Sequence, residues 1–449
     1  MKADLVIYSK RTLTPGGFKE ATVFIADGKI MDVVEGKSTN DVEVIDAGDS
    51  VLMPGLIDSH VHINEPGRTE WEGFETATKS AAAGGITTLV DMPLNSSPVT
   101  TTKKAFKEKL DSTKGKLFVN CGFWGGIVPG NTDDIQPLIN AGVLGFKAFL
   151  THSGIDDFPN VDIADLEKAS PFLSKENIPL LVHAELDWEH RGQQALEENP
   201  DSYKAYLNSR PKEWEDEAIA MMIDLCEAFK LKVHIVHLSS SNSLEQLKAA
   251  RMKGLPITIE TCPHYLFFNA ENIPDGDTRF KCAPPIREKE NNDLLWQALK
   301  EGLIDFVVTD HSPAPPELKK IDSGNLKDAW GGIASLQFSL PVMWTLMERK
   351  DFSIEDLSRL MSSNVAKFLS LDASKGKIEK GFDADLVIWN PGNKFRVRQS
   401  MTHHRHKMSP YEGVELSGVV EQTYVGGIKV FDNGSFVSSP PGKIILRNP

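Results

Sequence analysis

The chain has 449 residues, of which 40% are hydrophobic and 25% charged, and its formal net charge is −14. This composition is ordinary for a globular protein, and the acidic balance argues against a nucleic-acid partner because phosphate binding needs a basic surface. No apolar run approaches the length of a signal-peptide core or a membrane span, so we expect no membrane contact.

Cysteine usage indicates a reducing compartment. The four cysteines are widely spaced and form no CxxC pair; they are Cys121, Cys226, Cys262 and Cys282. This pattern favours reduced, buried thiols in a cytoplasm over a disulfide framework. A local basic cluster has the spacing of one helix face, which we expect to be solvated. Its members are Lys103, Lys104, Lys107 and Lys109.

The two ends of the chain share one pattern. Residues 1–52 contain short strand-like pieces, and "ATVFIADGKIMDVVEG" places an Asp-Gly turn signal between two of them. Residues 380–449 return to the same pattern in "GFDADLVIWNPG" and "GVVEQTYVGGIKVFDNGSF". We expect residues 1–52 and 380–449 to form one small β-sandwich domain built from both termini.

Residues 53–379 alternate between strand-like and helical segments. Eight runs are rich in apolar and β-branched residues: "LMPGLIDSHVH", "GITTLVDMP", "LFVNCGFWG", "VLGFKAFL", "IPLLVHAE", "LKVHIVHLS", "LPITIETCP" and "GLIDFVVTDHS". Amphipathic stretches such as "EWEDEAIAMMIDLCEAF" lie between them. The alternation predicts an α/β fold, a (β/α)8 TIM barrel with its active site at the carboxyl ends of the strands. An open doubly wound sheet is the alternative, but no glycine-rich phosphate turn follows the first strand.

Several of these runs end in side chains that a buried strand normally avoids. His60 and His62 close the first run and point the same way, because strand side chains alternate with period 2. The fifth, sixth and eighth runs end in His183, His237 and Asp310. A single buried histidine is usually a core residue. Imidazoles and a carboxylate at corresponding strand ends instead predict a site for zinc, manganese or cobalt.

Lys147, in the fourth run, does not fit a metal site as a protonated amine. An ammonium group beside metal ions is repelled and costly to bury. A neutral amine that combines with carbon dioxide becomes a carbamate, whose two anionic oxygens can bridge two metals. A lysine that extends from the strand end to water is the alternative.

The remaining histidines are predicted to have lesser roles. His234 lies three residues before His237 and faces the other side of its strand, which indicates a core or supporting residue. Three others near strand ends are expected to line the pocket without binding metal: His152, His264 and His311. The "HHRH" segment at residues 403–406 is predicted to be a solvated loop.

Longer strings resemble the cyclic amidohydrolases of the binuclear-metal amidohydrolase superfamily, which include dihydroorotase, dihydropyrimidinase or hydantoinase, and allantoinase. The resemblance covers essentially the whole chain. The strings most similar to allantoinases are "DSHVHINEPGRTEWEGFETAT", "DMPLNSSPVTT", "GFWGGIVPGN", "ETCPHYL", "KCAPPIR", "VVTDHSPAPPELK" and "WGGIASLQ". Strings of this length are improbable by chance, so the resemblance is specific.

The resemblance implies two divalent metal ions, zinc in the first instance, with Co²⁺, Mn²⁺ or Ni²⁺ as alternatives. The ligands of one ion would be His60, His62, Lys147 and Asp310. The ligands of the other would be Lys147, His183 and His237, with N6-carboxylated Lys147 as the bridge. Paired cations acidify a shared water that attacks a ring amide carbonyl. Asp310 would accept a proton from that water and then deliver it to the leaving ring nitrogen.

Substrate preference has one indication in the sequence. Relatives of the dihydroorotase type carry arginine two positions after the second histidine, where it pairs with a substrate carboxylate, and this chain has Asn64 there. A neutral ring with several amide groups fits better, and the resemblance implies that allantoin is opened to allantoate in purine degradation. It also implies a substrate-contacting wall of Asn64, Asn95, Cys282, Ala283 and Ser312.

Two other functions are open at this point. A hydantoinase or dihydropyrimidinase would perform the same chemistry on another neutral ring. A non-catalytic scaffold, resembling relatives that have lost metal ligands, predicts gaps in the ligand set, and this chain has none. Relatives are commonly homotetramers, and we expect the same assembly here.

Overall fold

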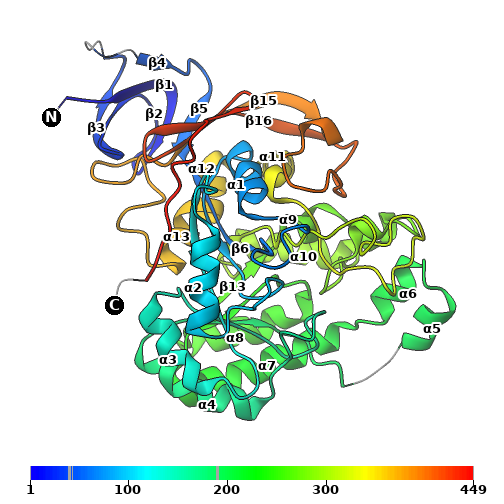
Figure 1. The fold of residues 1–449 in the computed structure, drawn as a ribbon. Coiled ribbons are helices and arrows are strands. Elements are labelled where there is room, and N and C mark those ends of the chain that lie inside the picture. Colours follow the sequence, from blue (N-terminus) through cyan, green and yellow to red (C-terminus); the bar gives the residue numbers. More distant parts are fainter. Residues whose placement is uncertain (1, 39–41, 43, 189–191, 448–449) are drawn as a thin grey trace.

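The structure is a computed structural model that describes residues 2–38, 42, 44–188 and 192–447. Strands from both ends of the chain form one sheet, and the middle of the chain combines helices with parallel strands (Figure 1). The expected mixed α/β class is confirmed. Among the described residues, no helix is long and apolar enough to cross a membrane.

A nine-stranded sheet joins the two ends of the chain, in the order β18-β17-β16-β15-β5-β1-β2-β3 with β4 paired to β1. The bounds are β1 Leu5–Thr14, β2 Gly17–Ala26, β3 Lys29–Glu35, β4 Val44–Asp46, β5 Val51–Pro54, β15 Leu386–Arg396, β16 Glu415–Val425, β17 Ile428–Asp432 and β18 Ser435–Phe436. Asp27 and Gly28 form the predicted turn between β2 and β3, with φ of 51° and 75°. Positive φ at both positions is what a tight hairpin requires.

The seam between the two chain ends is the antiparallel pair of β5 and β15, in which Met53 lies opposite Val387. The sheet therefore extends two residues past the expected boundary at residue 52. One buried cluster takes side chains from both ends, among them Ile7, Leu52 and Leu386. Apolar burial of this kind holds the termini together.

Parallel strands in the middle of the chain form two sheets, β6-β7-β8 and β14-β13-β12-β11-β10-β9. The bounds are β6 Leu56–Val61, β7 Ile86–Asp91, β8 Asn120–Phe123, β9 Gly125–Gly126, β10 Phe146–Phe149, β11 Leu180–His183, β12 Val233–Ile235, β13 Ile257–Thr261 and β14 Phe306–Val307. Each predicted run contains one of these parallel strands, and the third contains β8 together with the first residue of β9.

Backbone hydrogen bonds connect the two parallel sheets at both edges. At one edge the Leu144 N–H donates to the Phe123 carbonyl over 3.0 Å. At the other edge Val61 pairs in parallel with His311, and the His62 N–H donates to the His311 carbonyl over 2.8 Å. The first and last predicted ligand positions are thereby brought together.

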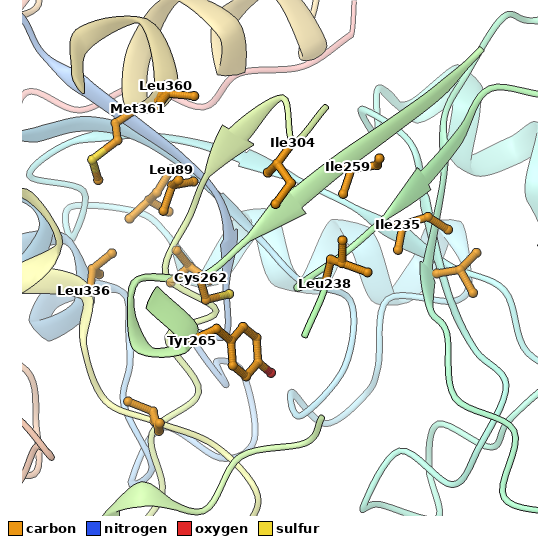
Figure 2. Packing of buried hydrophobic residues seen from close by; sticks show 14 of the residues in the cluster. Leu89, Ile235, Leu238, Ile259, Cys262, Tyr265, Ile304, Leu336, Leu360 and Met361 are labelled. Carbon is orange, nitrogen blue, oxygen red and sulfur yellow. The ribbon is translucent and has the colours of Figure 1, made fainter. Parts of the chain in front are cut away.

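Helices separate most of the successive parallel strands along the chain. They are α1 Phe74–Ala83, α2 Lys103–Ser112, α3 Thr132–Ala141, α4 Ile163–Lys175, α5 Gln193–Glu198, α6 Tyr203–Asn208, α7 Lys212–Phe229, α8 Leu244–Met252, α9 Pro263–Phe267, α10 Lys289–Lys300, α11 Ser339–Met347, α12 Ile354–Ser358 and α13 Asn364–Phe368. Part of the main core is shown in Figure 2, where Leu89, Ile235 and Ile259 project from β7, β12 and β13. All four cysteines are buried and free, as predicted.

The predicted solvated lysine face is wrong for one of its members. Lys103, Lys104 and Lys107 are exposed, but the Lys109 side chain is only 1% exposed and its Nζ lies 2.5 Å from Asp91 Oδ2. Asp91 ends β7 inside the protein and also accepts the Ile63 N–H over 2.9 Å. A buried carboxylate needs a cation, and Lys109 supplies it.

We expect Lys109→Met to lower the free energy of unfolding by about 3–5 kcal/mol, because it leaves the Asp91 carboxylate buried without its cation. Lys107 on the same helix pairs with Asp111 at the surface, so Lys107→Met is the matched control and should change stability by less than about 1 kcal/mol. Urea denaturation of the two variants measures the difference. Equal effects would contradict the role assigned to Lys109.

Candidate metal centre

A cavity of about 720 Å³ lies at the carboxyl ends of the parallel strands. Its wall includes five of the six predicted ligands, namely His60, His62, His183, His237 and Asp310. All five side chains are buried. The edge of the parallel strands at which their side chains meet is the edge where α/β barrels place active sites.

Asp310 faces the two histidines at the carboxyl end of β6. Its Oδ1 lies 3.1 Å from His60 Nε2 and 3.4 Å from His62 Nε2. Ligand atoms of His60, Asp310 and His237 all lie within 4.8 Å of one another. A carboxylate oxygen and imidazole nitrogens at this spacing can share one divalent cation.

His183 and His237 form the second half of the site. His183 Nδ1 lies 3.0 Å from His237 Nε2. Burial lowers the pKa of both imidazoles below the ordinary value. Both rings are therefore neutral at pH 7, and neutral imidazole is the form of histidine that binds metal.

Lys147 is fully buried on β10, and its Nζ has no hydrogen-bond partner among the described residues. The amine lies 4.8 Å from the Phe149 ring centroid, and that ring stacks on His183 at 4.6 Å. Burial lowers the pKa of the amine to about 7. A buried polar group without a partner costs free energy, so this position fits a lysine that carries a further group.

Three of the four histidines have a side-chain partner on the ring nitrogen that does not face the other proposed ligands. Glu260 Oε1 lies 2.5 Å from His60 Nδ1, Glu185 Oε2 lies 2.7 Å from His183 Nε2, and Asn95 Nδ2 lies 3.2 Å from His62 Nδ1. The two carboxylates accept a ring N–H, which orients His60 and His183 and leaves their other nitrogen free to bind a metal. Asn95 fixes the orientation of the His62 ring.

The electrostatics of the site favour a cation. Burial opposes charge on His60, but the carboxylates of Asp310 and Glu260 overcome it and raise the pKa of His60 to about 9. Burial also opposes charge on Asp310, but His60 and His62 outweigh it and hold the pKa of that carboxyl well below its usual range. The carboxylate therefore stays ionised, and positive charge beside it is stabilised.

The amidohydrolase family model matches residues 51–430 of the sequence. This chain belongs to the amidohydrolase family. An allantoinase from Streptomyces avermitilis is 46% identical over 99% of both chains, and one from Arabidopsis thaliana is 45% identical over 98% of this chain and 90% of its own. Among solved structures, the L-hydantoinase (dihydropyrimidinase) from Arthrobacter aurescens superposes with a TM-score of 0.92 at 31% identity, covering 99% of this chain and all of its own.

The glutamates of this amidohydrolase site were absent from the sequence prediction. Glu260 accepts hydrogen bonds from both His60 and His234, the latter over 2.9 Å, so His234 has the supporting position that its strand phase predicts. Glu185 is paired in turn with Arg210. A signal was present, because each glutamate is a charged residue inside a buried strand-like run.

Four residues of the site have left-handed backbone conformations. Asn64, Asn95, His237 and Asp310 have φ of 67°, 69°, 39° and 46°. Asparagine, aspartate and histidine adopt this region more readily than other residues that carry a side chain. All four residues are therefore of types that suit the backbone conformation found here.

The predicted substrate wall is only partly at the cavity. Asn95, Ala283 and Ser312 line it, but Asn64 and Cys282 do not. Asn64 is fully buried and donates from Nδ2 to the Pro313 carbonyl over 3.4 Å. Cys282 is also buried, with its carbonyl accepting the Tyr206 hydroxyl over 2.7 Å. These two residues lie behind the wall and support it.

The structure differs from the predictions for the remaining histidines in two respects. His152 lines the cavity, whereas His264 and His311 do not. The "HHRH" segment is not a solvated loop, because His404 is fully buried and the Arg405 N–H donates to Glu72 Oε1 over 3.1 Å. Glu72 is itself buried, and a buried carboxylate needs such donors.

We expect Glu260→Gln to weaken metal affinity by about 10- to 100-fold, because the variant keeps the shape but loses the charge that orients His60. Competition with a chelator measures the affinity. Glu271→Gln is the control, since Glu271 is exposed and accepts the Lys289 N–H at the surface, and it should leave affinity unchanged. Unaltered affinity in Glu260→Gln would show that the contact is only structural.

Proposed function

We propose that this amidohydrolase is an allantoinase, which hydrolyses a ring amide bond of allantoin and releases allantoate. The observation that carries the proposal is the convergence of four imidazoles and one carboxylate at a single cavity, with an unpartnered buried amine beside Phe149 of its wall. The allantoinase relatives, which match nearly the whole chain, support the substrate. The chain is accordingly a hydrolase that acts on cyclic amides.

We propose that two divalent metal ions bind at this site, with zinc the expected element. One ion would be bound by His60, His62, Lys147 and Asp310, and the other would be bound by Lys147, His183 and His237. The donor set fits, because buried nitrogens and a carboxylate oxygen face one another, and the Lys147 amine has no hydrogen-bond partner among the described residues. A carbamate on Lys147 would replace this buried amine that lacks a partner. When bound, such ions polarise a carbonyl oxygen and acidify water.

Asp310 is the proposed acid–base residue. Its pKa is held well below the usual range, so it is ionised and can accept a proton from the attacking water. The same oxygen that faces the histidines can then return the proton to the ring nitrogen, whose bond to the carbonyl carbon breaks. Protonation of that nitrogen is necessary because an amide anion is a poor leaving group.

Asn95, Ala283 and Ser312 are proposed to contact the ring, since they line the cavity with the acid–base residue. We also propose that the parallel strands close into a (β/α)8 barrel over residues 53–379, which the hydrogen bonds at both sheet edges support. Residues 1–52 and 380–449 would then form the β-sandwich domain, supported by the buried cluster that spans both termini. The free, buried cysteines support a cytoplasmic location, and the family resemblance supports a homotetramer.

A hydantoinase or dihydropyrimidinase is the second candidate, because the solved structures that superpose on this chain carry those names. A panel of allantoin, hydantoin and dihydrouracil distinguishes the candidates. We expect the highest kcat/KM on allantoin. Faster opening of dihydrouracil than of allantoin by the metal-loaded enzyme would overturn the allantoinase assignment and leave the hydrolase site intact.

A further inference from the structure

Three cationic side chains other than histidine line the cavity, and two of them already have anionic partners. Arg210 pairs with Glu185 through two nitrogens, at 2.5 and 3.2 Å, and Lys327 pairs with Glu197 at 3.2 Å. Lys281 has no carboxylate partner among the described residues. It is therefore the cation in this wall that remains available to a ligand.

The Lys281 amine is positioned but not saturated. It donates to the carbonyls of Lys327 and Ala329, over 3.0 and 2.6 Å, and lies 5.2 Å from the Tyr206 ring centroid. An ammonium group has three N–H donors, so one has no partner among the described residues. The side chain is buried yet lines the cavity. A fixed amine with a spare donor at a cavity wall is suited to recognise an oxygen acceptor.

Lys319 provides an internal comparison. Its buried Nζ donates to the carbonyls of Lys281, Trp330 and Gly332, over 2.7, 2.9 and 2.5 Å, so all three donors are used. It does not line this cavity. Both lysines hold the segment 327–332, but only Lys281 has a donor to spare at the cavity.

The acceptor that Lys281 would bind is best uncharged. Asp187 and Asp328 also line the cavity, and their negative charge disfavours an anion there. Burial lowers the pKa of the Lys281 amine to about 7, and an oxygen acceptor would favour the charged form again by accepting its third N–H. A urea-type carbonyl is a strong neutral acceptor. Allantoin carries such a carbonyl on its exocyclic ureido arm, which unsubstituted hydantoin lacks.

We propose that Lys281 is a specificity-determining residue that donates a hydrogen bond to the ureido carbonyl of the substrate. This inference rests on the proposed function, because it assumes a ureido-substituted ring at the metal site. Lys281 would select the arm while Asp310 acts on the ring. A site built to hydrogen-bond a substrate group rejects analogues that lack it more strongly than an apolar pocket does.

The test compares Lys281→Met with Lys319→Met in the full-length, metal-loaded enzyme. For each variant, kcat/KM is measured on allantoin, and the inhibition constant of hydantoin is measured by competition against allantoin. We expect Lys281→Met to lower kcat/KM on allantoin about 10- to 100-fold, the loss of one hydrogen bond to a charged donor, with hydantoin binding changed less than about twofold. Lys319→Met should affect both ligands by the same factor, because it only loosens segment 327–332.

Equal losses for allantoin and hydantoin in Lys281→Met would overturn the proposal, as would unchanged kcat/KM on allantoin. If Lys281→Met does not fold, Lys281→Gln takes its place, since its amide has two N–H donors for the two segment carbonyls but none to spare. Allantoin turnover by the wild-type enzyme tests the proposed function separately. Absence of allantoin turnover there would refute the allantoinase assignment, whereas wild-type turnover with equal losses in the variant would refute only the role of Lys281.

Discussion

Lys147→Ala is expected to abolish both bound metal and allantoin turnover. The variant removes the amine that is proposed to carry the bridging carbamate, and with it two of the anionic oxygens proposed to hold the ions. Loss of several kcal/mol of charge stabilisation corresponds to a rate loss of roughly 10³-fold or more. Metal analysis and turnover on the same variant measure the two effects together.

A short carboxylic acid in solution provides the control for Lys147→Ala. Acetate or propionate can occupy the space left by the side chain and present two oxygens, so it should restore part of the metal content and turnover, whereas chloride at equal ionic strength should not. In the wild type, ¹³C-labelled bicarbonate should give a carbamate signal by NMR that the variant lacks. Full activity in Lys147→Ala would show that the site does not need a carbamate on this residue.

Asp310→Asn is expected to lower kcat by about 10²- to 10⁴-fold, the usual contribution of a positioned acid–base group. Asparagine fits the left-handed backbone at this position, where φ is 46°, so the fold should be retained. The amide cannot accept the proton from water, and it is also a weaker metal ligand. Turnover measured at saturating zinc separates the chemical effect from lost metal.

Asp187→Asn is the matched control for Asp310→Asn, because Asp187 lines the same cavity but is exposed to solvent. Its kcat should stay within a few-fold of wild type. Comparable losses in the two variants would mean that general negative charge in the cavity matters, and not a proton acceptor at Asp310.

The ligand positions could be predicted from the sequence because they break the apolar pattern of the strands. His60 and His62 are polar residues with period 2 at the end of a buried run, and the structure places both nitrogens against Asp310. Local turn chemistry was equally readable, since Asp27-Gly28 adopts the turn that its composition predicts.

Contacts between distant segments could not be predicted in this way. Nothing in the helical spacing of Lys109 shows that Asp91, 18 residues earlier, needs a buried cation. Likewise His404 is polar and follows a loop pattern, but the terminal segment folds back to contact Glu72, 333 residues from Arg405 in sequence. Whether such polar residues are buried depends on contacts between distant segments, and these contacts outweigh the local preferences of the sequence.

Metal quantification combined with allantoin turnover on the same preparation tests most directly whether one cavity holds two metal ions and supports opening of an amide ring. We expect close to two divalent ions per chain, with turnover that falls in step with metal content during chelation and returns when zinc is restored. Fewer than one ion per chain in a fully active preparation would contradict a catalytic site with two metal ions.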